Sequence, residues 1–258
     1  MIDLHTHVLP GIDDGPRDMV GSVAMAARAA ECGTRTLVAT PHIRHDWPNV
    51  HPAQIRELAI EVNRTVREHG IDLFVMPGGE VDLATGIDMD DEQLRLVTLG
   101  GNGRDLLVET PYGPLPTVFE DLLARLGERG FRLTLGHPEL NWSFQHDHAR
   151  LGRIAESGIL IQVTARSLAA ARGSRARTLA ADALKNGWVH VIASDGHSAD
   201  WRPPDLKEGA DAARRAVGEE EVEWMVRDAP LAIVEGRDLP ERPERTRGAG
   251  RFAFLRRG

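Results

Sequence analysis

Cysteine and long apolar runs are scarce in this sequence, and each scarcity narrows the classes of protein to which it can belong. Cys32 is the only cysteine among 258 residues, which excludes an internal disulfide and a cysteine-based zinc site. No apolar run approaches the roughly 18 residues of a membrane helix, so we expect no membrane span. The N-terminus lacks a basic segment followed by an apolar core, so we expect no signal peptide and a cytoplasmic location.

An excess of acidic residues argues against a general nucleic-acid binder. The chain has 39 aspartates and glutamates against 31 lysines and arginines, a formal net charge of −8 with histidine neutral. Nucleotide-binding signatures are also missing, since there is no Gly-x-x-x-x-Gly-Lys-Ser/Thr and no strand-linked Gly-x-Gly-x-x-Gly. No serine or cysteine lies in a nucleophile elbow. With 41% hydrophobic and 27% charged residues, the composition is that of a globular protein.

Short apolar segments alternate with helical patterns along most of the chain. This βα repeat predicts a parallel sheet with right-handed crossovers. At this length a closed or nearly closed α/β barrel is favoured over an open sheet, and no linker divides the chain. We therefore predict a single domain. The predicted strands cover residues 1–7, 36–40, 72–76, 105–109, 132–135, 159–163 and 189–193.

Metal-ligand residue types follow six of these seven strands. His5 and His7 are two residues apart on a strand, so their imidazoles point in one direction. In a parallel barrel the carboxyl ends of all strands lie on one face, where active sites are built. Imidazoles and carboxylates without thiolates suit zinc, manganese or iron. The candidate ligands are His5, His7, His42, Glu80, Glu109, His137, Asp195 and His197.

Eight ligands are too many for one ion, so we predict two or three divalent metals bridged by a carboxylate such as Glu80. A bridged cluster stabilises the attacking and the leaving oxygen of an in-line displacement. With Asp14 added, four carboxylates carry four negative charges and three divalent ions carry six positive ones. The surplus of two matches a phosphate monoester dianion, whereas with two ions the surplus vanishes.

Barrel amidohydrolases are an alternative, because they also begin with His-x-His. Many of them bridge their metals with a modified lysine. Lys185 and Lys207 are the only lysines here, and both fall in helical patterns. The lysine-bridged subtype is therefore disfavoured, but amidohydrolases as a whole are not.

Six motifs resemble the polymerase and histidinol phosphatase (PHP) superfamily, most closely the bacterial tyrosine-protein phosphatases of capsule and exopolysaccharide operons. The similarity runs from residue 1 to about residue 235. It implies a distorted seven-stranded, TIM-like (β/α)7 barrel with a trinuclear site of manganese, or alternatively iron or zinc. The motifs are Met1-Ile-Asp-Leu-His-Thr-His7, Asp13-Asp-Gly15, Ala39-Thr-Pro-His42, Gly79-Glu80, Gly136-His-Pro-Glu139 and Ser194-Asp-Gly-His197.

The resemblance also implies a role for each ligand. Glu109 is histidine in many other members of the superfamily, so the glutamate favours the tyrosine phosphatase branch. A metal-bound hydroxide would attack phosphorus, with Asp14, His197 and Arg202 as catalytic residues. By motif, the first metal would be held by His5, His7, Glu80 and Asp195, the second by Glu80, Glu109 and His137, and the third by Asp14, His42 and His197.

One position departs from the resemblance. That branch typically has an arginine after His-Pro-Glu, where it clamps the phosphate, and here the residue is Leu140. Arg202 matches a second family arginine, five residues after the last histidine. Arg44 and Arg166 are candidates to replace the missing donor, and His45 is a candidate for the pocket wall.

The function expected from the resemblance is hydrolysis of phosphotyrosine in proteins, which would regulate capsule or exopolysaccharide synthesis. The partner implied is a phosphotyrosine protein such as a capsule-assembly tyrosine kinase. Two alternatives stay open. One is a small-molecule phosphoesterase acting on histidinol phosphate or a nucleotide, and the other is a weakly active metal-binding scaffold.

The last segment, residues 236–258, has a different composition. It contains seven arginines and three acidic residues, with a small apolar patch at Phe252, Phe254 and Leu255. This composition predicts a loosely ordered basic tail. The alternative is a docking segment for a partner or for another subunit of a homo-oligomer.

Overall fold

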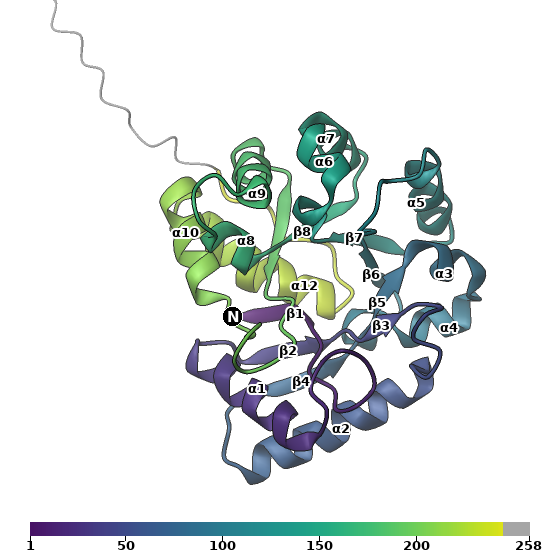
Figure 1. The fold of residues 1–258 in the computed structure, drawn as a ribbon, viewed down its shortest axis with the longest axis vertical. Coiled ribbons are helices and arrows are strands. Elements are labelled where there is room, and N and C mark those ends of the chain that lie inside the picture. Colours follow the sequence, from purple (N-terminus) through teal and green to yellow (C-terminus); the bar gives the residue numbers. More distant parts are fainter. Residues whose placement is uncertain (245–258) are drawn as a thin grey trace, which may run out of the picture.

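Parallel β-strands form the centre of the molecule in the computed structural model, which describes residues 1–244 (Figure 1). One sheet has the strand order β1-β2-β4, and the other has the order β3-β5-β6-β7-β8-β9. Every pairing within the two sheets is parallel. The strands are β1 (Ile2–Thr6), β2 (Thr36–Ala39), β3 (His42–Ile43), β4 (Phe74–Pro77), β5 (Glu80–Asp82), β6 (Asp105–Glu109), β7 (Arg132–Gly136), β8 (Leu160–Thr164) and β9 (Val189–Ala193).

A strand lies at each of the seven predicted positions, but the predicted count of seven and the closed barrel are not what the described residues form. They contain nine strands in two sheets, and no continuous ladder closes a barrel. The extra strands β3 and β5 follow breaks at Pro41 and at Gly78-Gly79. Pro41 has no amide hydrogen for the ladder. A Cβ on Gly78 would lie 2.8 Å from Val38, so the backbone at this break leaves no room for a side chain.

The two sheets adjoin at β1 and β9. Thr6 forms an isolated parallel bridge with Gly196, just after β9. The amide of His7 donates to the carbonyl of Gly196 at 2.8 Å, and the amide of Asp195 donates to the carbonyl of His5 at 2.9 Å. These bonds hold the first and the last strand side by side, although they are far apart in the sequence.

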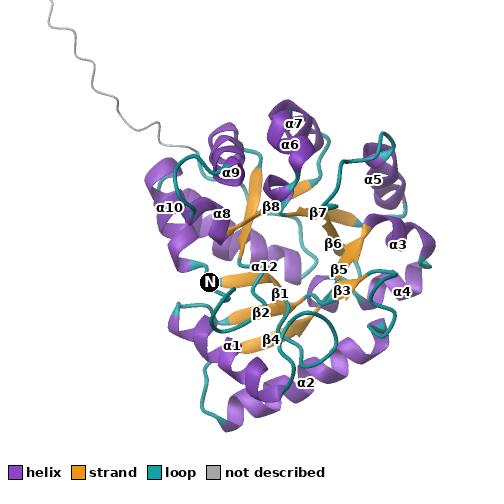
Figure 2. Cartoon of the chain, viewed as in Figure 1, coloured by secondary structure: helices purple, strands orange, loops and turns teal. Residues whose placement is uncertain are grey.

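Helices surround the strands on the outside (Figure 2). Helix α2 illustrates the pattern: Pro52 occupies its first turn, where no amide donor is needed, and Ile55, Ala59, Val62 and Val66 bury one face. Among residues 1–244, no helix is both long and apolar enough to cross a bilayer. The helices are α1 (Met19–Glu31), α2 (Pro52–Glu68), α3 (Leu83–Asp88), α4 (Asp91–Leu96), α5 (Phe119–Glu128), α6 (Trp142–His146), α7 (His148–Glu156), α8 (Ala165–Ala169), α9 (Arg175–Asn186), α10 (Lys207–Val217), α11 (Glu219–Glu223) and α12 (Ala229–Val234), with short helical turns at Leu99–Gly101, Pro138–Leu140 and Trp224–Asp228.

Helix α12 packs against the side of the strands where their amino ends lie. Asn102, just before β6, donates a hydrogen bond to the carbonyl of Ile233. Ile233 and Val234 join a buried cluster with inward side chains such as Leu4 and Val191. This apolar cluster fills the space between the sheets and leaves the carboxyl ends of the strands for polar side chains.

Residues 236–244 differ from the loose order expected of the tail. Leu239 packs against the buried core, and the indole of Trp224 donates to the carbonyl of Pro240 at 3.2 Å. Arg242 forms an ion pair with buried Glu221 at 2.6 Å and donates to the carbonyls of Gly187 and Val189, both at 2.7 Å. The apolar patch at residues 252–255 lies outside the described residues.

Helix α10 approaches α8 so closely that Gly209 is required at the contact. A Cβ at Gly209 would lie 2.4 Å from the Cα of Ala165, where only backbone movement could make room. We expect Gly209→Ala to lower the free energy of unfolding by about 1–3 kcal/mol, measured by urea denaturation. Gly127→Ala is the matched control, since Gly127 lies in α5 with no atom within 4 Å of the added methyl. It should leave stability unchanged or raise it slightly. Equal stability of the two variants would contradict this contact.

Candidate metal centre

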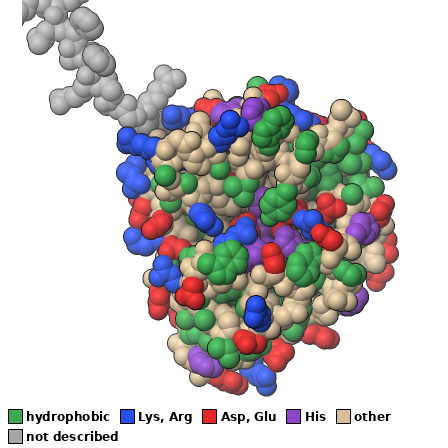
Figure 3. Space-filling view, viewed as in Figure 1, with side chains coloured by type: hydrophobic (Ala, Val, Ile, Leu, Met, Phe, Trp, Pro, Cys, Tyr) green, Lys and Arg blue, Asp and Glu red, His purple; other side chains and the backbone are tan. Residues whose placement is uncertain are grey.

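The nine predicted metal ligands converge at the carboxyl ends of the strands. Histidine and acidic side chains gather in the middle of the face seen in Figure 3. Eight of the nine side chains are buried, and Asp14 at the rim is half exposed. Four overlapping groups have ligand atoms within 4.8 Å of one another: His7, Asp14, His42 and His197; His5, His7 and Glu80; His5, His137 and Asp195; and His42, Glu80 and Glu109.

Glu80 lies at the centre of the cluster and is fully buried. Its Oε1 is 2.8 Å from His137 Nε2 and 3.4 Å from His5 Nε2. Its Oε2 lies 3.0 Å from His42 Nδ1, yet neither of these two atoms has a hydrogen-bond partner. Burial alone would raise the pKa of Glu80, but the neighbouring imidazoles hold it well below its usual value. Buried lone pairs without partners that converge from imidazoles and carboxylates fit a divalent cation.

Three of the candidate ligands have raised pKa values in the protein without metal. Burial opposes protonation of His42 and His137, yet the nearby carboxylates raise the pKa of each to about 9. Burial, reinforced by the negative charge of Glu80, raises the pKa of Glu109 to about 7. Bound cations would displace these protons, because metal ligands bind in their deprotonated forms.

Two ligands adopt a backbone conformation that is rare for residues other than glycine. His137 has φ 37° and Asp195 has φ 55°, both in the left-handed region. His137 follows directly on β7, and Asp195 is the second residue after β9. The chain turns sharply at both positions. Such strained positions persist only when the surrounding structure fixes them, and they cluster at functional sites.

Residues that orient the ligands were not predicted from the sequence. Asp13 Oδ2 lies 2.7 Å from His7 Nδ1 and accepts a hydrogen bond from the amide of His42 at 3.2 Å. Gln162 Oε1 lies 3.0 Å from His5 Nδ1. Gln162 belongs to β8, the strand with no ligand of its own. The available signals were an acidic neighbour of Asp14 and a lone polar residue within an apolar strand.

The predicted substrate-binding residues occupy different environments. Arg202 donates to Asp195 and lies 3.4 Å from His197 Nε2, so it contacts the cluster directly. Arg44 donates to Glu109 at 2.8 Å and also binds Asp46. The side chain of His45 is 71% exposed, and its nearest charged partner is Asp88 at 3.6 Å. The structure therefore brings two of the predicted arginines to the cluster but not His45.

The third arginine, Arg166, lines a pocket of about 340 Å³ that opens beside the cluster. Asp195 and Arg202 connect this pocket to the ligands. Its walls also contain Tyr112, Leu140 and Trp201, all of which are exposed.

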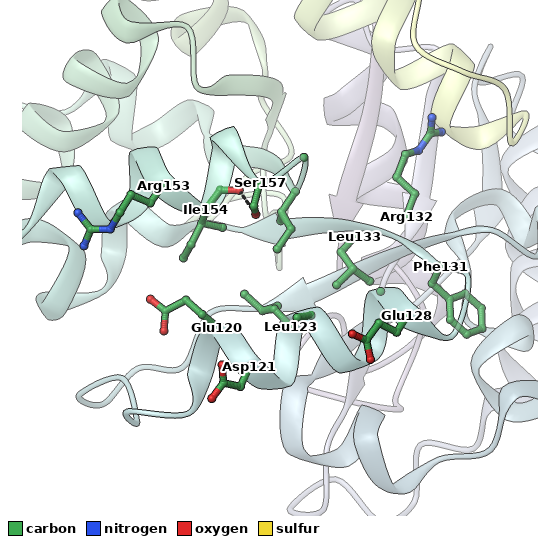
Figure 4. A pocket seen from close by; sticks show the side chains of 14 residues that line it. Glu120, Asp121, Leu123, Glu128, Phe131, Arg132, Leu133, Arg153, Ile154 and Ser157 are labelled. Carbon is green, nitrogen blue, oxygen red and sulfur yellow. Dashed lines mark hydrogen bonds between the residues drawn. The ribbon is translucent and has the colours of Figure 1, made fainter.

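A larger cavity lies elsewhere in the described part of the chain. It has a volume of about 850 Å³ and opens between α5 and α7 (Figure 4). It borders Phe131 and Ile159, at the amino ends of β7 and β8, whereas the ligands lie at the carboxyl ends. Leu123 and Ile154 face each other across it, and none of the nine ligands lines it. The chemistry is therefore expected in the smaller pocket.

A parallel α/β chain with histidines and carboxylates gathered at the carboxyl ends of its strands defines a class, the metal-dependent hydrolases. The family follows from the sequence: the model of the CpsB/CapC family of capsular polysaccharide synthesis matches residues 1–235, and the chain belongs to this family. This confirms the predicted resemblance.

Similar proteins extend over nearly the whole chain. The tyrosine-protein phosphatase YwqE of Bacillus subtilis is 28% identical over 99% of this chain and 100% of its own. The tyrosine-protein phosphatase CpsB of Streptococcus pneumoniae is 26% identical over 91% of this chain and 98% of its own. A crystal structure reported for YwqE and CpsB, described as unique metal-dependent tyrosine phosphatases, superposes with a TM-score of 0.86 at 28% identity. It covers 95% of this chain and 100% of that one.

Asp13 provides a test of the ligand geometry that leaves every proposed ligand in place. Asp13→Asn removes the charge that fixes the ring of His7, and we expect metal affinity to fall roughly 10- to 100-fold. Titration against a chromogenic chelator measures this affinity. The control is Asp72→Asn, a change to a carboxylate that is 94% exposed on the surface. An Asp13 variant with wild-type affinity would exclude an orienting role.

Proposed function

We propose that this protein is a metal-dependent phosphomonoesterase that hydrolyses phosphotyrosine in proteins. The observation that carries the proposal is the convergence of nine histidine and carboxylate side chains, with buried Glu80 at their centre. Membership of the CpsB/CapC family supports the substrate class, since its relatives YwqE and CpsB are named tyrosine-protein phosphatases.

Two or three divalent ions, with manganese as the first choice and iron or zinc as alternatives, would occupy this cluster. The clustering of ligand atoms supports a third ion held by Asp14, His42 and His197, and a first ion bound by His5, His7 and Glu80. Asp195 Oδ1 lies 3.4 Å from His5 Nε2 and completes the first set. For the second ion, Glu80 and Glu109 group with His42, while His137 contacts Glu80 at 2.8 Å. Bound ions would polarise the phosphoryl group and lower the pKa of the attacking water.

The residues of the chain bind and orient the substrate. Arg202 offers a planar guanidinium beside the ligands, suited to two phosphate oxygens. Asp14 and His197 lie 3.3 Å apart at the open rim, where they can hold the attacking water and its proton. A tyrosine phenolate has a pKa near 10, which makes it a better leaving group than an alkoxide, so a strong general acid is less needed.

The fold that supports this site is, we infer, a distorted barrel with seven strand positions. Two of these positions are each occupied by two short consecutive strands, β2 with β3 and β4 with β5. Hydrogen bonds between the β1 and β9 ends join the first position to the last.

The biological setting follows from the family and belongs to the proposal. The substrate would be a phosphotyrosine protein in the cytoplasm, such as a tyrosine kinase of capsule assembly. Dephosphorylation would then regulate capsule or exopolysaccharide synthesis.

A second candidate is a phosphoesterase for small alkyl phosphates. Leu140 motivates it, because this pocket residue stands where the tyrosine phosphatase branch typically has a phosphate-binding arginine.

Turnover of two substrates by the manganese-loaded protein separates these functions. We expect kcat/KM to be higher for a phosphotyrosine peptide than for histidinol phosphate, because the phenolate leaves more readily. Glu80→Gln should reduce turnover more than about 100-fold, since even outer partners of metal ligands cost 10- to 100-fold. Preference for histidinol phosphate would favour the second candidate. Full metal occupancy with no turnover of either substrate would indicate a scaffold.

A further inference from the structure

The pocket beside the metal ligands contains two cationic side chains among its described lining residues, Arg166 and Arg202. Arg202 already donates to Asp195. Arg44, on the other side of the cluster, is bound to Glu109 and Asp46. Both of these arginines are therefore partly neutralised by carboxylates before any substrate arrives.

Arg166 differs from them, because it forms no hydrogen bond or ion pair with any residue in the described range 1–244. Its side chain is exposed and lines the pocket together with Leu140 and Arg202. An uncompensated guanidinium beside a proposed phosphate site is available to an incoming anion at full charge.

The backbone beneath Arg166 is held firmly, although the side chain is exposed. Arg166 is the second residue of α8, directly after β8. Thr164 caps this helix through the amide of Ser167, and Thr164 also donates to buried Glu139 at 2.9 Å. Ala165 packs against Gly209 of α10 without space for a methyl group. The guanidinium is thus attached to a fixed point at the pocket, which reduces the entropy lost on binding.

Three other lining residues of this pocket suit an aromatic substrate. Tyr112 and Trp201 are 62% and 65% exposed, and Leu140 is 39% exposed. All three line the pocket that contains Arg166. Exposed apolar and aromatic side chains at the entrance of a charged site can pack against a substrate ring while its phosphate reaches the cations.

We propose that Arg166 is a phosphate-binding residue of this pocket and acts with Arg202 on an aryl phosphate whose ring lies against Leu140 and Tyr112. This inference rests on the proposed phosphatase function and identifies how the site compensates for the cation that Leu140 cannot supply. A phosphate dianion accepts more charge-assisted hydrogen bonds than one arginine provides, and a second guanidinium supplies them.

The test compares Arg166→Ala, Arg166→Lys and the wild type, all loaded with manganese. The first readout is KM and kcat for a phosphotyrosine peptide, and the second is the Kd of inorganic phosphate from calorimetry. For Arg166→Ala we expect both KM and Kd to rise roughly 10-fold or more, with metal content unchanged. Arg166→Lys should recover part of the loss, because it keeps the charge but not the planar fork.

Arg172→Ala is the matched control, since Arg172 is exposed six residues further along and lines a different pocket. It should match the wild type in both readouts. Leu140→Arg adds a guanidinium from the same pocket, and in the Arg166→Ala background it should restore most of the lost affinity. In the wild-type background it should change KM and Kd much less. This non-additivity distinguishes charge supply from a general structural role.

The two readouts separate failure of the inference from failure of the proposed function. Wild-type turnover with unchanged KM and Kd in Arg166→Ala would overturn the role of Arg166 and leave the phosphatase function intact. Absence of turnover by the wild type would count against the phosphatase function. The Kd of inorganic phosphate would then test the role of Arg166 by itself. Equal losses in Arg166→Ala and Arg172→Ala would also overturn the inference, because any surface arginine would have the same effect.

Discussion

The buried carboxylate of Glu80 is the group on which the arrangement of the site depends. It is fully buried and is surrounded by the imidazoles of His5, His42 and His137. A buried charge is costly unless it is paired, so this carboxylate needs a compensating positive charge close by. Protonation of His42 and His137 balances the charge in the protein alone, while divalent ions balance it with ligands deprotonated. The residues that contact Glu80 come from both sheets, His5 from β1 and His42 from β3.

Several residues around Glu80 lie where the regular strand structure is interrupted. Strand β2 ends before Pro41, and β3 begins with His42 directly after it. Strand β4 ends before the tightly packed Gly78-Gly79, and β5 begins with Glu80. His137 and Asp195 turn with left-handed backbone immediately beyond their strands. Each irregularity aims a ligand inward rather than along the sheet. The breaks that prevent a continuous barrel ladder are thus the places where the metal centre is built.

Arginines distribute positive charge unevenly around this centre. Arg44 and Arg202 form ion pairs with the carboxylates of Glu109 and Asp195, which fixes the positions of these carboxylates. Arg166 has no such partner among residues 1–244, and it follows β8, whose Gln162 orients His5 instead of supplying a ligand. The segment around the sixth predicted strand therefore places an amide beside His5 and, just after the strand, an arginine without a partner among residues 1–244.

The sequence by itself determined where the strands lie and which residues are candidate metal ligands. Apolar segments that end in histidine or carboxylate predicted that eight such residues share one face, because the carboxyl ends of parallel strands lie together. The family resemblance, not the pattern, grouped His5, His7, Glu80 and Asp195. The sequence could not reveal the division into two sheets, since Gly78 and Gly79 matter only through their approach to Val38 and Val97. Nor could it separate His45, which turns to Asp88, from Arg44, one residue earlier. Orientation by Asp13 and Gln162 and the docking of Arg242 on Glu221 also depend on distances between residues remote in the chain. Only tertiary packing fixes such distances, because local propensity specifies each element but not which faces meet.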